Sequence, residues 1–318
     1  MESMEIKRKK ILVTGGAGFI GGHLVKELLN LGAKVSVIDI KVLPKSTFAL
    51  NKLKRKTNLK LIDIRNKKKL GNFFKKYTPD YIIHLAAEPI VEKAFDDPTS
   101  TFETNINGTI NLLEEIRRNK KIKGIIAASS DKAYGKTVKK YTEQSPLRGD
   151  HPYDVSKSCM DLICQTYVRT YNLPVVVTRF GNVYGEGDLY LNRIIPGISE
   201  ALVKNKTLNI RSNGKYVRDY LYVKDVAAGY IFLLKKFEKV KGEAYNFSSK
   251  DTFSVLDLIK KIEKITGKKI KYKILNTARN EIPYQHLDDS KIKKLGWSNK
   301  FQLEKVFNQI AEWYKVNV

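Results

Sequence analysis

Five side chains in two short stretches have the types and spacing for acid–base chemistry on a hydroxyl group. Ser130, Asp131 and Lys132 follow the apolar run KGIIAA in the stretch SSDKAYG, and Tyr153 and Lys157 lie further along in YDVSK. Residues four apart share one face of a helix, so we expect the Lys157 ammonium beside the Tyr153 phenol. A neighbouring positive charge lowers the pKa of a phenol. We therefore expect Tyr153 to act as a general base, with Ser130 holding the same substrate oxygen.

A glycine-rich turn near the N-terminus predicts a dinucleotide site. The stretch KILVTGGAGFIGGHL gives a strand, a turn with Gly15, Gly18 and Gly21, and a helix, in that order. Glycines let backbone N–H groups approach a pyrophosphate, which the helix N-terminus also favours. Asp39 ends the next strand, where a carboxylate accepts hydrogen bonds from ribose hydroxyls and repels a 2′-phosphate. The pattern favours NAD, and Lys41 leaves NADP as the alternative.

A second acidic residue follows another apolar run. Asp63 and Ile64 lie at the end of this run in the stretch LIDIR. We expect them to cap an adenine through one hydrogen bond and one apolar contact. Taken alone, Asp63 fits a loop or a helix-capping residue equally well.

The elements that position these residues alternate regularly between strand and helix. Apolar strand-like runs are followed by amphipathic stretches through the first half of the chain, which predicts a parallel sheet with helices on both faces. We therefore expect an α/β fold, a doubly wound Rossmann sheet with a smaller mixed α/β substrate lobe. The expected domains are residues 1–180 for NAD and 181–318 for the substrate, interleaved, with 217–230 returning to the first domain.

Composition narrows the class of protein. The net charge of +26 could indicate nucleic acid, but only 12 of the 59 basic residues are Arg, the residue that reads bases by paired hydrogen bonds. We expect a Lys-rich solvated surface that attracts an anionic small substrate, and no nucleic-acid partner. Apolar runs are short, so we expect no signal peptide, no membrane partner and a cytoplasmic location.

The sequence gives no sign of a metal site. Cys159 and Cys164 lie five apart in one predicted helix, which is neither a metal-binding spacing nor a disulfide framework. The four His residues are scattered along the chain. We expect no metal.

The motifs together resemble one family, the extended short-chain dehydrogenases/reductases that act on nucleotide sugars. The resemblance covers essentially the whole chain and is carried by the stretches TGGAGFIG, DIR, HLAA, TNINGT, SSDKAYG, YDVSK, RFGNVYG, VRDYLYVKDVA and LGW. It implies that NAD oxidises a sugar hydroxyl and returns the hydride in the same turnover. It adds to the cofactor site Phe19, Ile20, Leu85, Ala86, Ala87, Asn105, Tyr153 and Lys157. It also implies a homodimer in which helices at 102–118 and 153–171 pair across a two-fold axis.

The resemblance gives Asp131 and Lys132 specific roles. Similar 4-epimerases carry small residues there, whereas nucleotide-sugar 4,6-dehydratases carry an acid followed by a base. By that resemblance Asp131 protonates the departing C6 oxygen and Lys132 removes the C5 proton. The alternative is a surface ion pair, or a Lys132 that faces solvent.

Three stretches resemble the CDP-glucose 4,6-dehydratase family in particular. These are HLAAEPIV, with Glu88 where that family has Gln, SSDKAYG, and GNVYGEGDLYLNRIIP. Two features depart from that family: the chain is shorter, and VRDYLYVKDVA replaces its RPWQHV. The nucleotide could therefore be CDP, UDP, GDP or dTDP, with CDP favoured.

A diphosphate substrate requires cationic and polar partners in the second lobe. Arg218 matches a pyrophosphate-binding Arg of the family, and Arg179 is expected to hold structure. The other expected substrate residues are Glu88, Asn182, Arg193, Arg211 and Arg279.

Two other functions compete with a dehydratase. A nucleotide-sugar 4-epimerase of the UDP-hexose type would use Tyr153 and NAD, and Asp131 and Lys132 would be incidental. A cofactor-binding regulatory or nucleic-acid-associated protein would have lost catalysis, which the intact Ser130, Tyr153 and Lys157 argue against. Fold alone does not decide between them.

Overall fold

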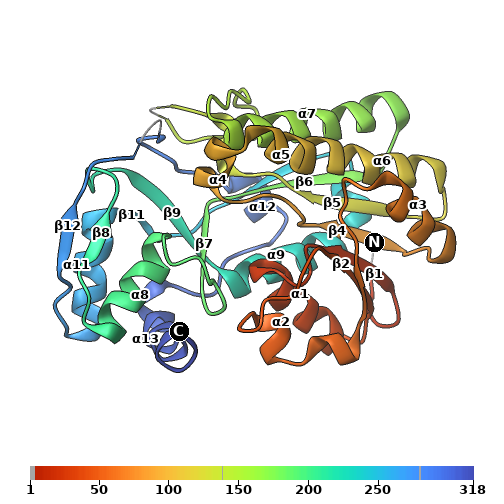
Figure 1. Cartoon of the computed structure of the whole chain (residues 1–318). Coiled ribbons are helices and arrows are strands. Elements are labelled where there is room, and N and C mark those ends of the chain that lie inside the picture. The colour runs from red at the N-terminus through yellow and green to blue at the C-terminus, as the bar shows by residue number, and fades with distance from the viewer. Residues whose placement is uncertain (1–3, 138, 279–280) are drawn as a thin grey trace.

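The apolar runs of the first half form one parallel sheet with helices on both faces, which confirms the predicted fold. A computed structural model describes residues 4–137, 139–278 and 281–318 (Figure 1). The sheet has seven strands in the order β10–β6–β5–β4–β1–β2–β3. These strands are β1 (Lys10–Thr14), β2 (Lys34–Asp39), β3 (Asn58–Leu61), β4 (Tyr81–His84), β5 (Gly124–Ala128), β6 (Val175–Phe180) and β10 (Ala244–Phe247).

Helices bury both faces of this sheet. In β1, Ile11 and Val13 pack on one face and Leu12 on the other, because side chains alternate along a strand. One face is covered by α1 (Phe19–Asn30), α2 (Thr47–Leu50), the 3₁₀ turn Leu53–Lys56, α9 (Val223–Lys235), α10 (Phe237–Val240) and α12 (Ser290–Lys294). The other is covered by α3 (Lys67–Lys76), α6 (Gly108–Arg118) and α7 (Pro152–Tyr171).

A second lobe has its own hydrophobic core. It contains a three-stranded sheet in the order β11–β9–β7 and the pair β12–β8. Its elements are β7 (Asn182–Tyr184), α8 (Ile194–Lys204), β8 (Leu208–Ile210), β9 (Val217–Tyr222), β11 (Thr252–Ser254), α11 (Val255–Thr266), β12 (Tyr272–Ile274) and α13 (Leu303–Asn317). In Figure 1 this lobe lies to the left of the large sheet.

The chain passes between the lobes more than once. Segment 217–230, expected to return to the first domain, divides: β9 pairs with β7 and β11, whereas α9 packs against α1. Strand β9 can serve both lobes because Leu221 faces the core of the large sheet while Tyr220 and Tyr222 face the other core. Strand β10, which the sequence pattern did not predict, adds the seventh strand beside β6.

The helix expected over 102–118 is interrupted. It consists of α5 (Pro98–Phe102), a wider π-helical turn at Glu103–Asn107, and α6. The short helix α4 (Val91–Asp96) precedes it. Such wide turns often occur at functional sites, and this one contains Asn105.

The carboxyl ends of the parallel strands meet at one edge of the sheet, toward the second lobe. Ligands of open α/β sheets bind at this edge. The short 3₁₀ turn Asp131–Tyr134 follows β5 here. Within the described ranges, none of the helices combines the length and the apolarity that crossing a bilayer requires.

Candidate active site

The turn between β1 and α1 accepts only glycine at two positions. Gly15 has a φ of +69°, and a Cβ there would lie 2.7 Å from the backbone nitrogen of Ala86. A Cβ on Gly21 would lie 2.2 Å from the carbonyl oxygen of Gly15. No side chain caps α1 at Gly18. The first N–H groups of this helix therefore have the geometry that an anionic phosphate requires.

Asp39 at the end of β2 is tied to the glycine turn. Its carboxylate accepts hydrogen bonds from the backbone N–H of Ala17 at 2.9 Å and of Ile40 at 2.8 Å. Burial raises the pKa of Asp39, and these backbone donors oppose that effect. Asp39 therefore lies beside the turn, as the dinucleotide hypothesis requires.

Asp63 and Ile64 are arranged differently from the sequence expectation. Asp63 forms an ion pair with Arg65 at 2.7 Å, and the hydrogen bonds from Arg65 lower the pKa of this carboxyl. The Ile64 side chain is buried against Gly108, at the start of α6. The apolar contact from Ile64 to an adenine stays a prediction, and the structure shows that this side chain also packs in the core.

The segment after β4 lies against the glycine turn. Leu85 donates its N–H to the carbonyl oxygen of Thr14, and Ala86 makes the close approach to Gly15. Asn105, expected to bind cofactor, fixes this segment through its side chain. Its Oδ1 accepts from the N–H of Glu88 at 2.8 Å, and its Nδ2 donates to Glu88 O and to Ser156 Oγ. These hydrogen bonds fix the Asn105 side chain, and its contact with the cofactor stays a prediction.

Ser130, Tyr153 and Lys157 come together as the sequence predicts, at the end of β5 and the first turns of α7. Burial raises the pKa of the Tyr153 phenol, and a hydrogen bond with Ser130 lowers it. The predicted lowering of this pKa by Lys157 is not seen, because the Lys157 amine donates to the Ala128 carbonyl oxygen at 2.8 Å. Burial also lowers the pKa of Lys157 to about 8.

Asp131 and Lys132 are not a surface ion pair. Asp131 is 2% exposed, and its carboxylate accepts from the Ser130 hydroxyl at 2.9 Å and from Gln285 Nε2 at 3.0 Å. The Lys132 amine donates to Gln285 Oε1 at 3.1 Å. One amide therefore contacts both groups, and Asp131 lies near enough to Tyr153 for its charge to raise the pKa of that phenol.

Two residues of this cluster escaped the sequence analysis. Asp154 follows Tyr153 directly and is buried; its burial raises its pKa to about 7, while the Lys132 charge opposes the shift. Its position inside the YDVSK motif is the sequence feature that could have predicted a place in this cluster. Gln285 lies in no motif, and its contact with Asp131 spans 154 positions of the chain. Nothing in the sequence points to that contact.

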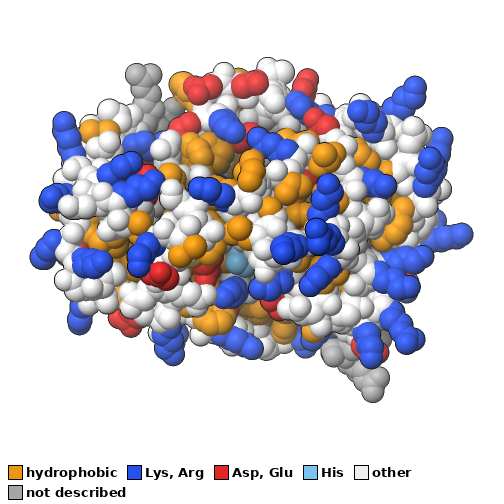
Figure 2. Space-filling view, turned by 60° about the horizontal axis from the view of Figure 1, so that its bottom comes forward, with side chains coloured by type: hydrophobic (Ala, Val, Ile, Leu, Met, Phe, Trp, Pro, Cys, Tyr) orange, Lys and Arg blue, Asp and Glu red, His pale blue; other side chains and the backbone are white. Residues whose placement is uncertain are grey.

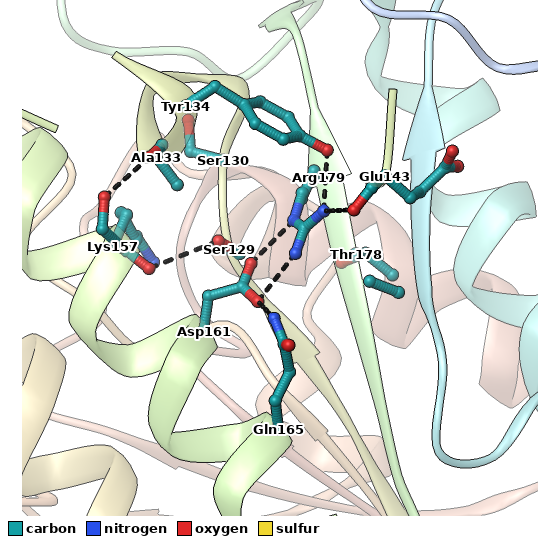
Figure 3. A network of polar contacts seen from close by, with 12 residues as sticks. Ser129, Ser130, Ala133, Tyr134, Glu143, Lys157, Asp161, Gln165, Thr178 and Arg179 are labelled. Carbon is teal, nitrogen blue, oxygen red and sulfur yellow. Dashed lines mark hydrogen bonds and ion pairs between the residues drawn. The ribbon is translucent and has the colours of Figure 1, made fainter. Parts of the chain in front are cut away.

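A buried network beneath the site fixes the Asp131–Tyr134 turn (Figure 3). Arg179 on β6 donates to both carboxylate oxygens of Asp161 on α7, at 2.7 and 2.9 Å. It also donates to the Tyr134 hydroxyl at 2.7 Å. Arg179 is 1% exposed, so this charge is compensated entirely inside the protein. Arg179 therefore joins β6, α7 and the Asp131–Tyr134 turn, which is a structural role, as the sequence predicts.

The arginines expected to bind substrate each contact an acid of the chain. Their partners are Asp188 for Arg193 at 2.9 Å, Glu281 for Arg218 at 3.3 Å, and Glu92 for Arg211. The pair with Glu92 joins α4 to the segment after β8, and thus one lobe to the other. Arg218 also lies near enough to Asp154 to lower its pKa.

The remaining expected substrate residues differ in availability. The Asn182 amide nitrogen is buried and has no hydrogen-bond partner among the described residues, so it is free to donate to a ligand. The Glu88 carboxylate accepts from the Ile90 N–H at 3.2 Å, near the start of α4. Arg279 lies outside the described residues.

A parallel sheet with a glycine turn and a buried Ser–Tyr–Lys set defines a class: Rossmann-fold enzymes of the short-chain dehydrogenase/reductase type. The chain belongs to the NAD dependent epimerase/dehydratase family, whose model matches residues 11–248. NAD, predicted from Gly15, Gly18, Gly21 and Asp39, is the cofactor for which the family is named. The resemblance found in the sequence is confirmed.

The chain is similar to relatives of several activities. It is 32% identical to a trifunctional UDP-glucose 4,6-dehydratase/epimerase/reductase of Arabidopsis thaliana, with 97% of this chain matching 47% of that protein. It thus spans about half the length of this relative. It is 30% identical to the CDP-glucose 4,6-dehydratase of Salmonella typhimurium, covering 96% of this chain and 90% of the relative.

Solved structures of the same fold include both reaction types. A UDP-glucose 4-epimerase of Thermotoga maritima, 31% identical, superposes with a TM-score of 0.86 over 96% of this chain and 98% of the epimerase. A dTDP-glucose 4,6-dehydratase of Streptomyces venezuelae with NAD bound, 27% identical, gives 0.87 over 96% and 97%. Overall similarity therefore does not separate dehydratase from epimerase.

Proposed function

We propose that the chain is an NAD-dependent nucleotide-sugar 4,6-dehydratase. The observation that carries this proposal is that Asp131 is buried beside Ser130 and that Gln285 contacts both Asp131 and Lys132. A 4-epimerase needs no acid and base beyond the hydroxyl chemistry of Tyr153. An acid and a base directed at the same sugar are what a water elimination requires.

The residues around the glycine turn fit NAD. Backbone N–H groups at the start of α1 would hold the pyrophosphate, and Asp39 would accept from a ribose hydroxyl. Phe19, Ile20, Leu85, Ala86 and Ala87 flank that turn and would line the dinucleotide. NAD, when bound, accepts a hydride from C4 of the sugar and returns it to C6.

Each proton has an assigned residue in this proposal. Ser130 orients the C4 hydroxyl and Tyr153 removes its proton, after which C4 is a ketone and the C5 hydrogen is acidic. Lys132 takes the C5 proton, and Asp131 protonates the C6 oxygen, which leaves as water. Lys132 returns its proton to C5, and the proton from the C4 hydroxyl restores Asp131. The product is a nucleotide-linked 4-keto-6-deoxyhexose.

Activation of Tyr153 requires a nearby positive charge, because burial raises the pKa of its phenol. Lys157 lies one helical turn away and is the nearest such charge in α7. In its second role it would hold the nicotinamide ribose. Its amine therefore has to exchange the Ala128 carbonyl for these partners.

Within this class, we favour CDP-glucose as the substrate. The stretches HLAAEPIV, SSDKAYG and GNVYGEGDLYLNRIIP and the similarity to the Salmonella enzyme support it. The similarity to UDP- and dTDP-glucose dehydratases is of the same order, so the other nucleotides remain candidates. Arg193, Arg211, Arg218 and Asn182 are the groups proposed for the diphosphate and sugar, with Glu88 at the rim.

The second candidate is a UDP-hexose 4-epimerase. The Thermotoga epimerase superposes over nearly the whole chain, and VRDYLYVKDVA is a form that epimerases share with dehydratases outside the CDP-glucose family. In that case the buried Asp131 and the neighbouring Lys132 would have no chemical role.

The experiment that separates the candidates is a substrate screen. The protein with NAD is incubated with CDP-, UDP-, GDP- and dTDP-hexoses, and the products are weighed by mass spectrometry. Loss of one water from one substrate, with a 4-keto absorbance in base, supports the dehydratase. Products of unchanged mass with inverted C4 support the epimerase. Tight, salt-sensitive DNA binding without turnover would support the non-catalytic alternative.

We also propose that the protein forms a homodimer through the outer faces of α6 and α7. These helices lie side by side on one face of the large sheet (Figure 1). On α7, Leu162 and Tyr171 remain 50% and 46% exposed. Apolar side chains of this size are typical of a surface that a second subunit covers.

A further inference from the structure

A single buried amide links the proposed acid and base. Gln285 is 1% exposed, donates from Nε2 to Asp131 at 3.0 Å and accepts at Oε1 from the Lys132 amine at 3.1 Å. The amide thus presents its positive end to the carboxylate and its negative end to the ammonium. The contacts join a segment of the second lobe to the turn after β5.

The backbone holds Gln285 in place for this contact. Its N–H donates at 3.1 Å to the carbonyl oxygen of Val217, the first residue of β9. On either side, Tyr284 bridges to Val217, and the His286 carbonyl oxygen accepts from the Tyr141 N–H at 2.9 Å. An amide fixed on both flanks loses little freedom when it makes two further hydrogen bonds.

We propose that Gln285 is a positioning residue that orients Asp131 and Lys132 and stabilises the charged forms that the elimination creates. This inference rests on the proposed dehydratase function. The C5–H bond breaks, Lys132 gains that proton, and the electron pair forms a C5–C6 double bond. The C6–O bond breaks as the C6 oxygen takes the Asp131 proton and leaves as water. Both proton transfers leave Asp131 as a carboxylate and Lys132 as an ammonium, the two groups that Gln285 contacts in the structure.

The energetic argument is one of differential binding. The elimination requires Lys132 to react as a neutral amine and Asp131 as a neutral acid, and the amide gains little from these forms. As the protons move, both hydrogen bonds become charge-assisted, which makes them stronger. An interaction that strengthens toward the transition state lowers the barrier. Gln285 is therefore expected to accelerate elimination and to leave C4 oxidation unaffected.

Other ionisable groups also face this pair. These groups are Tyr153 and Asp154 on α7, Tyr141 in the loop after the Asp131 turn, and Arg218 on β9. Their charges also shift one another's pKa values. A pH profile of the whole reaction contains their titrations as well. The decisive measurement therefore isolates the elimination step.

The test compares Gln285→Leu with wild type in single turnovers. Leu has nearly the volume of Gln and makes neither hydrogen bond. Reduced cofactor is followed by absorbance, and loss of water by mass spectrometry of quenched samples. We expect C4 oxidation at the wild-type rate, elimination slowed about 10²-fold, and reduced cofactor accumulating between them. Equal slowing of both steps, or of neither, would overturn the inference.

A second variant separates the two halves of the bridge. Gln285→Glu keeps an acceptor for Lys132 but replaces the donor to Asp131 by a like charge. Because the new carboxylate lies beside both the Asp131 carboxyl and the Lys132 amine, both limbs of its elimination-rate profile should move to higher pH. In Gln285→Leu the two limbs should instead draw together. A rate that falls uniformly at every pH would mean a merely structural role. This variant also carries the test if Gln285→Leu does not fold.

Matched controls keep the outcomes distinct. Gln309→Leu removes an amide that donates to Glu186, in the second lobe, and should change neither step. Cofactor content and thermal unfolding verify each variant. A wild type that makes no dehydrated product overturns the proposed function, and this inference with it. A wild type that dehydrates while Gln285→Leu does so equally fast overturns the inference alone.

Discussion

The chemistry proposed for this chain depends on the surroundings of two adjacent side chains. Asp131 and Lys132 could have been a solvated pair, but the structure places Asp131 in the interior and gives both groups the same amide partner. The residue types and their order were readable from SSDKAYG. Their partner was not, because Gln285 reaches them only through the folding of the second lobe.

Removing the acid tests the role of Asp131. Asp131→Asn keeps the shape of the side chain and abolishes the proton donor for the C6 oxygen. Water loss should slow by about 10²- to 10⁴-fold, the usual contribution of a general acid, while C4 oxidation continues. The readout is the rate of dehydrated product by mass spectrometry. Turnover close to wild type would leave the epimerase as the better account.

Asp154 supplies a prediction that does not depend on the substrate. Burial raises its pKa to about 7, so the folded state holds a proton that the unfolded chain releases near pH 4. The unfolded state therefore binds fewer protons over this interval, and the stability that Asp154 contributes falls as pH rises from about 4 to about 7.

Asp154→Asn removes that titration. We expect the melting temperature of the variant to gain on wild type as pH rises from about 5 to about 8, measured by thermal unfolding. Asp96, exposed at the surface and not among the charges that act on Asp154, provides the matched control Asp96→Asn, which should show no such trend. A difference between Asp154→Asn and wild type that is constant with pH would contradict the buried carboxyl.

At the scale of elements, periodicity predicted most of the large sheet. Six of its strands and the helices around them follow apolar runs that are visible in the sequence. Strand β10 was not predicted, because its four residues lack a distinguishing pattern and join the sheet only by pairing with β6. Sequence patterns also do not show contacts between distant segments. The motif around Asn105 predicts that it binds a ligand, but it does not predict the hydrogen bonds of Asn105 with Glu88 and Ser156.

The glycine turn can be tested at its tightest point. Gly21→Ala places a methyl group 2.2 Å from the Gly15 carbonyl oxygen and 2.6 Å from the Gly16 Cα. The turn must then shift, at a cost of about 1–3 kcal/mol, and NAD affinity should fall. Calorimetric titration with NAD measures the effect.

Gly71→Ala is the matched control for that variant. Gly71 lies inside α3, where an added Cβ would have the flexible end of Glu115 as its nearest neighbour, at 3.3 Å. Helix propensity predicts a gain of up to about 1 kcal/mol and unchanged NAD binding. Unchanged NAD affinity in Gly21→Ala would contradict the assignment of this turn.

At the scale of the molecule, two lobes enclose the strand ends and a basic surface surrounds them. Lys and Arg side chains are spread across the whole face in Figure 2 and do not gather into one patch. A field of this kind attracts anionic small molecules without selecting a nucleic-acid sequence. The composition predicted this surface, whereas the division of segment 217–230 between the lobes required the structure.

The proposed dimer has a direct test. Leu162→Glu introduces a charge into the exposed apolar part of α7 and should convert a dimer into a monomer in sedimentation velocity experiments. Val316→Glu, at a position 73% exposed on α13, should leave the assembly unchanged. A wild type that sediments as a monomer, or a Leu162→Glu variant that remains dimeric, would contradict this interface.

The path of one hydrogen atom tests the central claim most directly. The sugar nucleotide selected by the screen is labelled with deuterium at C4, turned over with NAD, and examined by mass spectrometry and NMR. The account predicts a product lighter by one water that carries the deuterium on C6. A product of unchanged composition with the deuterium still on an inverted C4 would contradict it.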